Sequence, residues 1–289
     1  MIGWIYLILI SAITVGIAAV IEKQTLKKEY ATAYSTAFAF LIAILSIVFI
    51  PFAKFDLSAL SVMLIYAFSL LSTITYLVTA RILRHSSISA SSPILSVLPT
   101  VFIVIMAFFL LGETLTILQY VSIFVLIVAS YAIFFILPQN GKKLGKKERN
   151  KYLYILVITS VLMGISSIIN KYALNSVNPF TFIILAEFFI AVNFIIIITI
   201  RYKGVSEMLA SLEHHKLPIA AIAILTTISR ITYYIALSTS AVALAQPLLN
   251  AIYIVITVSA GIIVFSEGSI GKKLLLCVII LIFAFILVL

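Results

Sequence analysis

The stretch Pro93–Glu113, PILSVLPTVFIVIMAFFLLGE, is echoed 154 residues later by Pro247–Glu267, PLLNAIYIVITVSAGIIVFSE. Both copies begin at a proline, continue through an apolar run and end at a glutamate. A second echo joins VGIAAVIEK, which ends at Lys23, to MGISSIINK, which ends at Lys171. Self-similarity at a nearly constant distance is the signature of a duplicated unit. The sequence therefore predicts a chain built from two related halves.

The composition excludes a water-soluble protein. Of the 289 residues, 64% are hydrophobic and 10% are charged, and the mean hydropathy is +1.30. A soluble domain carries about 25% charged residues. The single cysteine, Cys277, excludes an intrachain disulfide and a multi-cysteine metal site. The first apolar run is longer than the core of a cleavable signal, so we interpret it as a membrane span.

Apolar runs bounded by charges, proline, glycine or serine clusters predict ten membrane-spanning helices. A helix needs about 20 mostly apolar residues to cross the hydrocarbon core. Only helices and closed barrels satisfy their backbone hydrogen bonds in lipid, and runs of this length favour helices. The expected spans are 3–21, 32–51, 58–82, 86–111, 115–137, 152–174, 179–201, 217–238, 241–266 and 271–289.

Five spans in each half is an odd number, so the second half must enter the membrane in the opposite orientation to the first. The predicted fold is an all-α integral membrane protein with ten transmembrane helices in two inverted five-helix repeats. The predicted domains are the first repeat at 1–137, a basic linker at 138–151 and the second repeat at 152–289. Ser206 is expected to cap a short interfacial helix in the other long connection.

The basic residues predict the topology. Of the 19 Lys and Arg residues, sixteen fall after odd-numbered spans, and only Lys54 and Lys171 fall on the other side. Cytoplasmic loops carry the Lys and Arg excess, so both termini are expected outside the cytoplasm, in the plasma membrane of the cell. The net charge of +10 then reports topology and attraction to anionic lipid, and no nucleic-acid partner is needed to explain it.

The two glutamate-ended helices resemble those of the EamA-like branch of the drug/metabolite transporter superfamily. The resemblance is carried by LGE at 111–113 and FSE at 265–267, by the lead-ins SSISASSP and SAVALAQP, and by the glycine-to-lysine pattern of the first helix in each half. The chain departs from the pattern because FSE lacks the glycine and Tyr253 stands where the first half has Pro99. The resemblance implies export or exchange of small metabolites such as amino acids, sugars or nucleotide sugars. It also implies cytoplasmic termini, against the charge distribution, which we follow.

Two charges inside predicted spans are the leading site candidates, because intramembrane ionisable residues are costly and commonly functional. Glu187 and Arg230 lie at one depth in consecutive antiparallel helices, and Gln246 and Asn250 are expected to reach the same depth. Arg230 could hold a carboxylate or phosphate bidentately, and Glu187 could bind an amine or exchange a proton. The alternative is a structural ion pair. Residues flanking Arg230 complete the predicted layer: Ser229, Tyr233 and Tyr234.

The first half offers uncharged candidates for the substrate-binding or coupling site. Each of them could equally serve helix packing. They are Thr73, Tyr76, Ser92 and Ser96, of which Ser92 and Ser96 are the repeat partners of Gln246 and Asn250.

Three prolines and the two motif glutamates have predicted structural or gating roles. Proline removes a backbone donor, so Pro93, Pro99 and Pro247 mark either a hinge or gate, or a static kink. Glu113 and Glu267 oppose the helix macrodipole at helix ends. A local partner, such as the N-terminus of the next helix, is expected to compensate them, which makes them structural.

The sequence therefore predicts a secondary transporter that works as an exporter, exchanger or facilitator. Its substrate would be a small polar metabolite, with an amino acid as one candidate and protons as a candidate coupling ion. Alternating access between the inverted repeats would be its mechanism. The alternatives are a lipid translocase and an enzyme acting on a lipid-linked substrate. The chain has no phosphate-binding Gly-Lys-Ser/Thr loop and no metal-ligand spacing, so we expect no enzyme activity, cofactor or metal.

Overall fold

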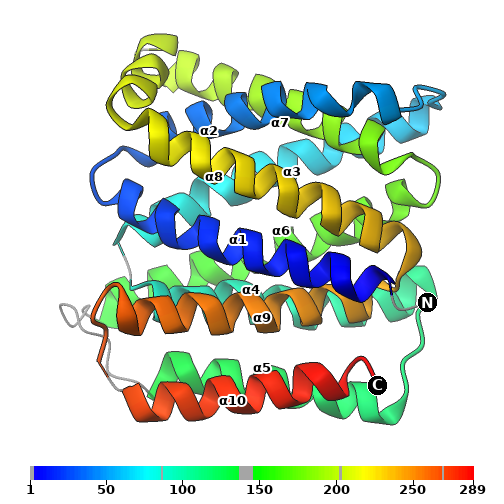
Figure 1. Ribbon diagram of the computed structural model, residues 1–289, viewed down its shortest axis with the longest axis vertical. Helices are drawn as coiled ribbons and strands as arrows, with labels where there is room; N and C mark the ends of the chain where they lie inside the picture. Colours follow the sequence, from blue (N-terminus) through cyan, green and yellow to red (C-terminus); the bar gives the residue numbers. More distant parts are fainter. Residues whose placement is uncertain (1–2, 86, 137–145, 202–203, 269) are drawn as a thin grey trace. The chain divides into compact units, whose positions relative to one another are not determined.

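The computed structural model describes residues 3–85, 87–136, 146–201, 204–268 and 270–289. The described residues form ten α-helices, a 3-10 turn η1 (Ile47–Phe52) and a π turn η2 (Ala107–Leu111) (Figure 1). The α-helices are α1 (Gly3–Leu26), α2 (Ala31–Ser46), α3 (Ala59–His85), α4 (Ile88–Met106), α5 (Ile117–Ile136), α6 (Lys146–Leu174), α7 (Pro179–Arg201), α8 (Val205–Thr239), α9 (Val242–Ile263) and α10 (Ile270–Ile286).

Eight of the described helical segments are long and apolar enough to cross a membrane, and residues 117–133 of α5 form a shorter apolar helix. The all-helical membrane class predicted from composition is therefore confirmed. Local sequence explains the helix starts where caps are visible. Asn178 accepts backbone N–H groups from Phe180 and Thr181 at 2.9 and 3.4 Å, and Pro179 occupies the first turn, where its missing N–H costs nothing.

Two connections differ from the sequence prediction. Helix α6 begins at Lys146, inside the predicted linker, and residues 137–145 of that linker lie outside the described residues. Helix α8 combines the expected interfacial helix with the eighth span across a kink at His215, whose φ is −132° and ψ is 34°. The prediction that Ser206 caps this helix is wrong, because the helix begins at Val205 after Gly204, which has a positive φ of 76°.

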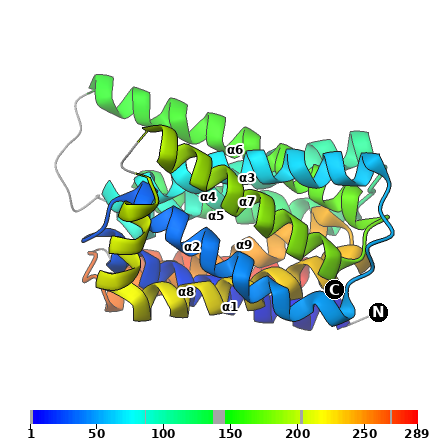
Figure 2. The same ribbon diagram turned by 90° about the horizontal axis from the view of Figure 1, so that it is seen from above.

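The chain forms two compact units, and each takes helices from both predicted repeats. The first unit contains residues 1–84 and 169–239, and the second contains residues 85–168 and 240–289. In the first unit, α8 packs against α1 and α2, and α7 packs against α2 (Figure 2). In the second unit, α4 packs against α9 and α5, and α10 packs against α5 and α9. The units group helices by contact, whereas the predicted repeats group them by sequence.

The two motif glutamates cap each other's helices within the second unit. Glu113, after α4, accepts the backbone N–H groups of Val242 and Ala243 at the start of α9, at 3.0 and 2.9 Å. Glu267, after α9, accepts those of Ile88 and its neighbour at the start of α4, at 3.1 and 3.2 Å. Helices α4 and α9 must therefore run antiparallel. A carboxylate at a helix N-terminus satisfies free donors and the positive end of the macrodipole.

These contacts confirm that a helix N-terminus compensates each glutamate, and they correct which helix does so. The expected partner was the next helix in sequence, α5 or α10. The observed partner is the corresponding helix of the other half. The antiparallel pairing of α4 with α9 brings the N-terminus of each helix beside the C-terminus of the other. The two caps are unequal. Glu267 also accepts a hydrogen bond from the Ser89 hydroxyl and has Lys273 Nζ at 3.7 Å.

The lysines of the second echo also make equivalent contacts, this time within the first unit. Lys23 donates to the carbonyl of Leu83 near the end of α3, and Lys171 donates to that of Leu237 near the end of α8, at 2.9 Å. The last carbonyls of a helix lack intrahelical partners and carry the negative end of the macrodipole. The lysines that made the duplication visible therefore stabilise the C-terminal ends of corresponding helices.

Candidate functional site

A buried ion pair lies at the centre of the first unit. Glu187 of α7 is 0% exposed, and Arg230 of α8 is 9% exposed. The guanidinium contacts the Glu187 carboxylate and donates to the hydroxyl of Tyr76 on α3. Its carbon also lies 4.9 Å from the centre of the Tyr76 ring, a cation–π arrangement. The expected proximity of Glu187 and Arg230 is confirmed, while their role in binding stays a prediction.

Aromatic rings form one wall of this site. Tyr234, one turn after Arg230, is 4% exposed and meets Phe182 edge-on at 4.9 Å between ring centroids. Its ring also lies 6.4 Å from that of Phe68 and 5.9 Å from that of Tyr233. Apolar rings exclude water, so the charges beside them interact in a low dielectric. Tyr233 and Tyr234, predicted from their spacing to Arg230, thus lie in the same unit as the ion pair.

A second carboxyl group in the first unit was missed by the sequence reasoning. Glu22 of α1 lies near Tyr34 of α2 and near Arg230. Tyr34 is 0% exposed. The available signal was the repeat itself, because Glu22 and Asn170 are partners in the echo and Asn170 is also buried, at 3% exposure.

Two of the predicted hydroxyl groups are occupied by helix contacts. Ser229 donates to the carbonyl of Ser11 at 2.9 Å, and the two hydroxyl groups are also 2.9 Å apart. Thr73 donates to the carbonyl of Ser69 in the preceding turn at 2.8 Å. These bonds join α8 to α1 and satisfy α3 internally, in the packing role that hydroxyl groups often have in membrane helices.

The amide candidates belong to the second unit. Asn250 donates to the carbonyl of Ser96 at 2.9 Å and to the hydroxyl of Thr100 at 2.8 Å, and it accepts from Gln246 at 3.1 Å. Ser92 is 0% exposed, and its hydroxyl has no partner among the described residues. The structure thus divides the predicted layer between the two units, and a common layer with Glu187 and Arg230 stays a prediction.

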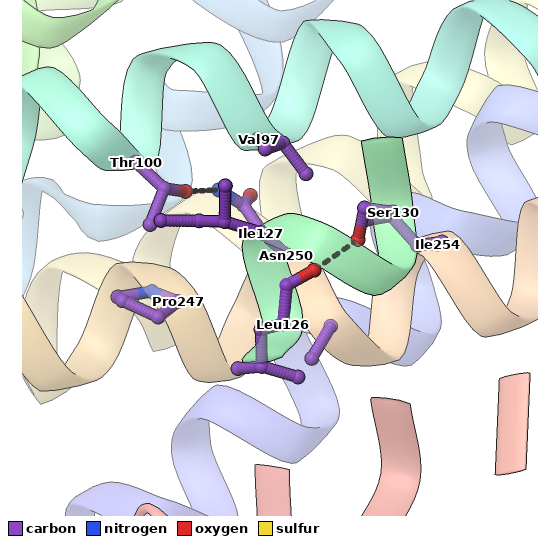
Figure 3. A pocket seen from close by; sticks show the side chains of 9 residues that line it. Val97, Thr100, Leu126, Ile127, Ser130, Pro247, Asn250 and Ile254 are labelled. Carbon is purple, nitrogen blue, oxygen red and sulfur yellow. Dashed lines mark hydrogen bonds between the residues drawn. The ribbon is translucent and has the colours of Figure 1, made fainter. Parts of the chain in front are cut away.

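A small pocket beside Asn250 is shown in Figure 3, lined by residues of α4, α5 and α9. Its volume of about 10 Å³ is near the limit for a single water molecule. The Asn250–Thr100 bond crosses it, and Pro247 lies in its wall. This pocket is too small for a metabolite, so Asn250 holds α9 to α4 in the described state.

All three predicted prolines are buried inside their helices. Pro93 and Pro99 lie within α4, and Pro247 lies within α9. Their role as a hinge or gate stays a prediction.

Residues one repeat apart touch each other in both units. Tyr76 and Arg230 are separated by 154 residues, and so are Ser96 and Asn250. The offset equals that of the echo in which the duplication was first seen. In each pair, one half contributes an uncharged group and the other contributes a stronger donor, a guanidinium or an amide. The two halves are therefore chemically unequal where they meet.

Among the described residues, no group of three His, Cys, Asp or Glu side chains is placed to hold a metal ion. The apolar helices and the buried charges together define a multi-pass membrane protein with a polar interior site.

Comparison with known proteins shows which family the first half of the chain is similar to. The model of the EamA-like transporter family, part of the drug/metabolite transporter superfamily, matches residues 2–135, which is nearly all of the first predicted repeat. None of the curated proteins matches the chain. One crystal structure of a protein aligns with a TM-score of 0.66 at 15% identity, covering 96% of each chain. At this identity the likeness shows the fold alone.

Proposed function

We propose that this chain is a secondary transporter of a small polar metabolite, acting as an exporter, exchanger or facilitator. The match of residues 2–135 to a transporter family supports the class. Amino acids are the first substrates to test, because the site offers a guanidinium for a carboxylate and carboxyl groups for an amine.

The observation that carries this proposal is the incomplete pairing of Glu187. The carboxylate is 0% exposed, and its Oε1 pairs with Arg230, whereas its Oε2 has no hydrogen-bond partner among the described residues. A buried ion pair is stable only when hydrogen bonds satisfy its remaining lone pairs. Arg230 alone leaves acceptor capacity at Glu187, and a substrate ammonium or a proton would supply the missing partner.

The charge balance of the cluster points the same way. Glu22, Glu187 and Arg230 contribute two carboxyl groups and one guanidinium. One proton or one substrate ammonium would make this group neutral, and neutrality lowers the cost of burying it. Protons are therefore the candidate coupling ion.

The proposed architecture is ten spans in two inverted repeats, 1–137 and 152–289, joined by the linker 138–151. The antiparallel pairing of α4 and α9 supports inversion for these two helices. In an inverted repeat, equivalent residues of the two halves touch only near the twofold axis that relates the halves. Tyr76 and Arg230 are equivalent residues in contact, and so are Ser96 and Asn250, which fits such an axis. Alternating access would exchange the roles of the two halves. The Lys and Arg distribution supports extracytoplasmic termini in the plasma membrane.

The binding test is a thermal-shift screen of the purified protein against amino acids, sugars and nucleotides. A ligand that binds only the folded state raises the apparent stability by mass action. We expect a zwitterionic ligand to stabilise the wild type and to lose its effect in Arg230→Ala. Arg84→Ala, which removes a guanidinium from the end of α3, is the matched control and should respond like the wild type. A response that survives in Arg230→Ala would contradict the assigned site.

The transport test uses proteoliposomes loaded with the stabilising ligand. Glu187→Gln keeps the shape of the side chain and removes its charge, so gradient-driven uptake should disappear while exchange remains measurable. Gradient-driven uptake at the wild-type rate in this variant would contradict proton coupling at Glu187. If no water-soluble solute moves or competes, the transporter proposal itself fails.

A further inference from the structure

A cavity at one end of the first unit lies outside the site described above. It is an open cavity lined by the α1–α2 loop, the start of α2 and the short arm of α8, which is residues 205–214 before the kink at His215. Its volume is about 350 Å³. Cavities of about 300–1,000 Å³ are typical of small-molecule sites. The size alone therefore allows a ligand of a few heavy atoms.

The walls of this cavity carry more negative than positive charge. Glu29 of the α1–α2 loop and Glu207 of the short arm both line it. The Glu29 carboxylate has His215 Nε2 at 3.3 Å. Glu207 forms no ion pair with any described residue. Lys27 and Lys28 precede Glu29 in the same loop, and the guanidinium carbon of Arg84 lies 4.9 Å above the Tyr30 ring, which is itself part of the wall.

Two further side chains of the short arm add hydrogen-bonding groups on the same face as Glu207. Ser211 follows it by one turn and His214 by two, so the three share one side of the helix. The Nδ1 atom of His214 lies 2.6 Å from the carbonyl of Ala210, which requires Nδ1 to donate. In the neutral ring, Nε2 is then an acceptor.

The Ser211 hydroxyl is the observation that points to a ligand. Ser211 is 2% exposed and lines the cavity, yet its hydroxyl oxygen has no hydrogen-bond partner among the described residues. Serine in a helix commonly donates to the carbonyl one turn back, as Ser91 does at 2.8 Å. A buried hydroxyl left unpaired costs free energy. A ligand in the cavity with a hydrogen-bond donor would remove that cost.

We propose that this cavity binds an organic ammonium group, held by Glu207 and Glu29 with Ser211 as a hydrogen-bond partner. An ammonium has three donors and no acceptor, and it matches two carboxylates and a hydroxyl. A bare metal ion fits less well, because no three acidic, His or Cys groups of the described residues are placed to coordinate one. The ammonium could belong to a soluble amine or to an ethanolamine headgroup, and both have the same binding chemistry.

Occupancy of this cavity would link two parts of the first unit. Glu29 belongs to the α1–α2 loop, whereas Glu207 belongs to the short arm that meets the long arm of α8 at His215. The long arm carries Arg230. A bound ammonium would therefore hold the loop against the short arm and fix the kink. This site is independent of the proposed transport site, because no residue is shared between them.

The soluble-amine test measures thermal unfolding of the full chain in an amine-free buffer. The probes are 1,4-diaminobutane and ethanolamine, with succinate as the anionic control. We expect both amines to stabilise the wild type, and we expect half-saturation in Glu207→Gln to need at least about tenfold more amine, because a charged partner is lost. Ser211→Ala should weaken binding less. The matched control is Glu213→Gln, which removes the same charge from an exposed position of the short arm outside the cavity.

The lipid test uses native mass spectrometry with phosphatidylethanolamine and phosphatidylglycerol. If the headgroup is the ligand, phosphatidylethanolamine should remain bound to the wild type and to Glu213→Gln and be lost from Glu207→Gln. The proposal is overturned if Glu207→Gln and Glu213→Gln behave alike in both tests. It is also overturned if no amine acts at up to about 10 mM, the range of weak binding, and no lipid is retained. Neither outcome bears on the loss of ligand response in Arg230→Ala.

Discussion

The reciprocal glutamate caps predict a large difference in stability between two otherwise similar substitutions. Glu267 is 9% exposed and accepts two backbone N–H groups and the Ser89 hydroxyl, with Lys273 beside it. Glu267→Ala removes these bonds and leaves Lys273, itself 4% exposed, without its carboxylate. Removing one partner from a buried charge pair costs about 3–5 kcal/mol. We therefore expect a loss of that size.

The matched substitution is Glu113→Ala. Glu113 is half-buried and accepts two backbone N–H groups, and its repeat position for Lys273 holds Gln119. Loss of a helix cap costs about 0.5–2 kcal/mol. The two variants should therefore differ by roughly 2 kcal/mol or more, with Glu267→Ala the less stable.

The assay is unfolding of the purified protein in mixed micelles, followed by helical circular dichroism. A double-mutant cycle with Lys273→Met isolates the charge pair, and its coupling energy should be about 1–3 kcal/mol. Equal losses for the two glutamate variants, or a coupling energy near zero, would refute the unequal roles assigned to the caps. If instead the glutamates bind substrate, Glu113→Ala or Glu267→Ala would abolish the thermal response to ligand in protein that is still folded.

Two further predictions test helix contacts. Gly164→Ala should destabilise the protein by about 1–3 kcal/mol, because the new Cβ would lie 2.9 Å from Phe102 Cβ of α4. Gly271→Ala is the control and should not destabilise the protein, because nothing lies within 4 Å of its new Cβ. Equal unfolding midpoints for the two variants would contradict this packing. Lys171→Met and Lys23→Met should lower stability by similar amounts, about 0.5–1.5 kcal/mol each, because the two lysines make equivalent contacts. Hydrogen exchange at the end of α8 should become faster in the first variant, and at the end of α3 in the second. Unchanged exchange at these ends would contradict the prediction.

The duplication could be read from the sequence because it rests on local patterns. Apolar runs, charge boundaries and the spacing of glycine, lysine and glutamate depend on residues close together in the chain. They predicted the all-helical class correctly, and they placed Glu187 and Arg230 at one depth in consecutive helices, with an ion pair between them as the alternative to a binding site. Consecutive antiparallel helices commonly pack side by side, as α7 and α8 do. The error at Ser206 arose because the helix begins one residue earlier, after Gly204 with its positive φ.

The contacts between distant segments could not be read in the same way. The partner of each motif glutamate depends on which helix lies beside α4 or α9, and the next helix in sequence was the wrong choice. The position of Glu22 near Arg230 likewise depends on how α1 packs against α8, which periodicity along one helix does not encode. The unpaired hydroxyl of Ser211 is visible only once burial is known, since serine is common in membrane helices.

The sequence by itself determined that this protein is an all-helical membrane protein whose two halves echo each other, because hydrophobic length and internal repetition are properties of the chain. The tertiary structure alone decided how the two halves share their interactions. It turned the glutamates of Pro93–Glu113 and Pro247–Glu267 into caps for each other's helices, and it set Tyr76 against its own repeat partner, Arg230. Such contacts arise from packing between segments more than 100 residues apart, and packing is a property of the folded chain.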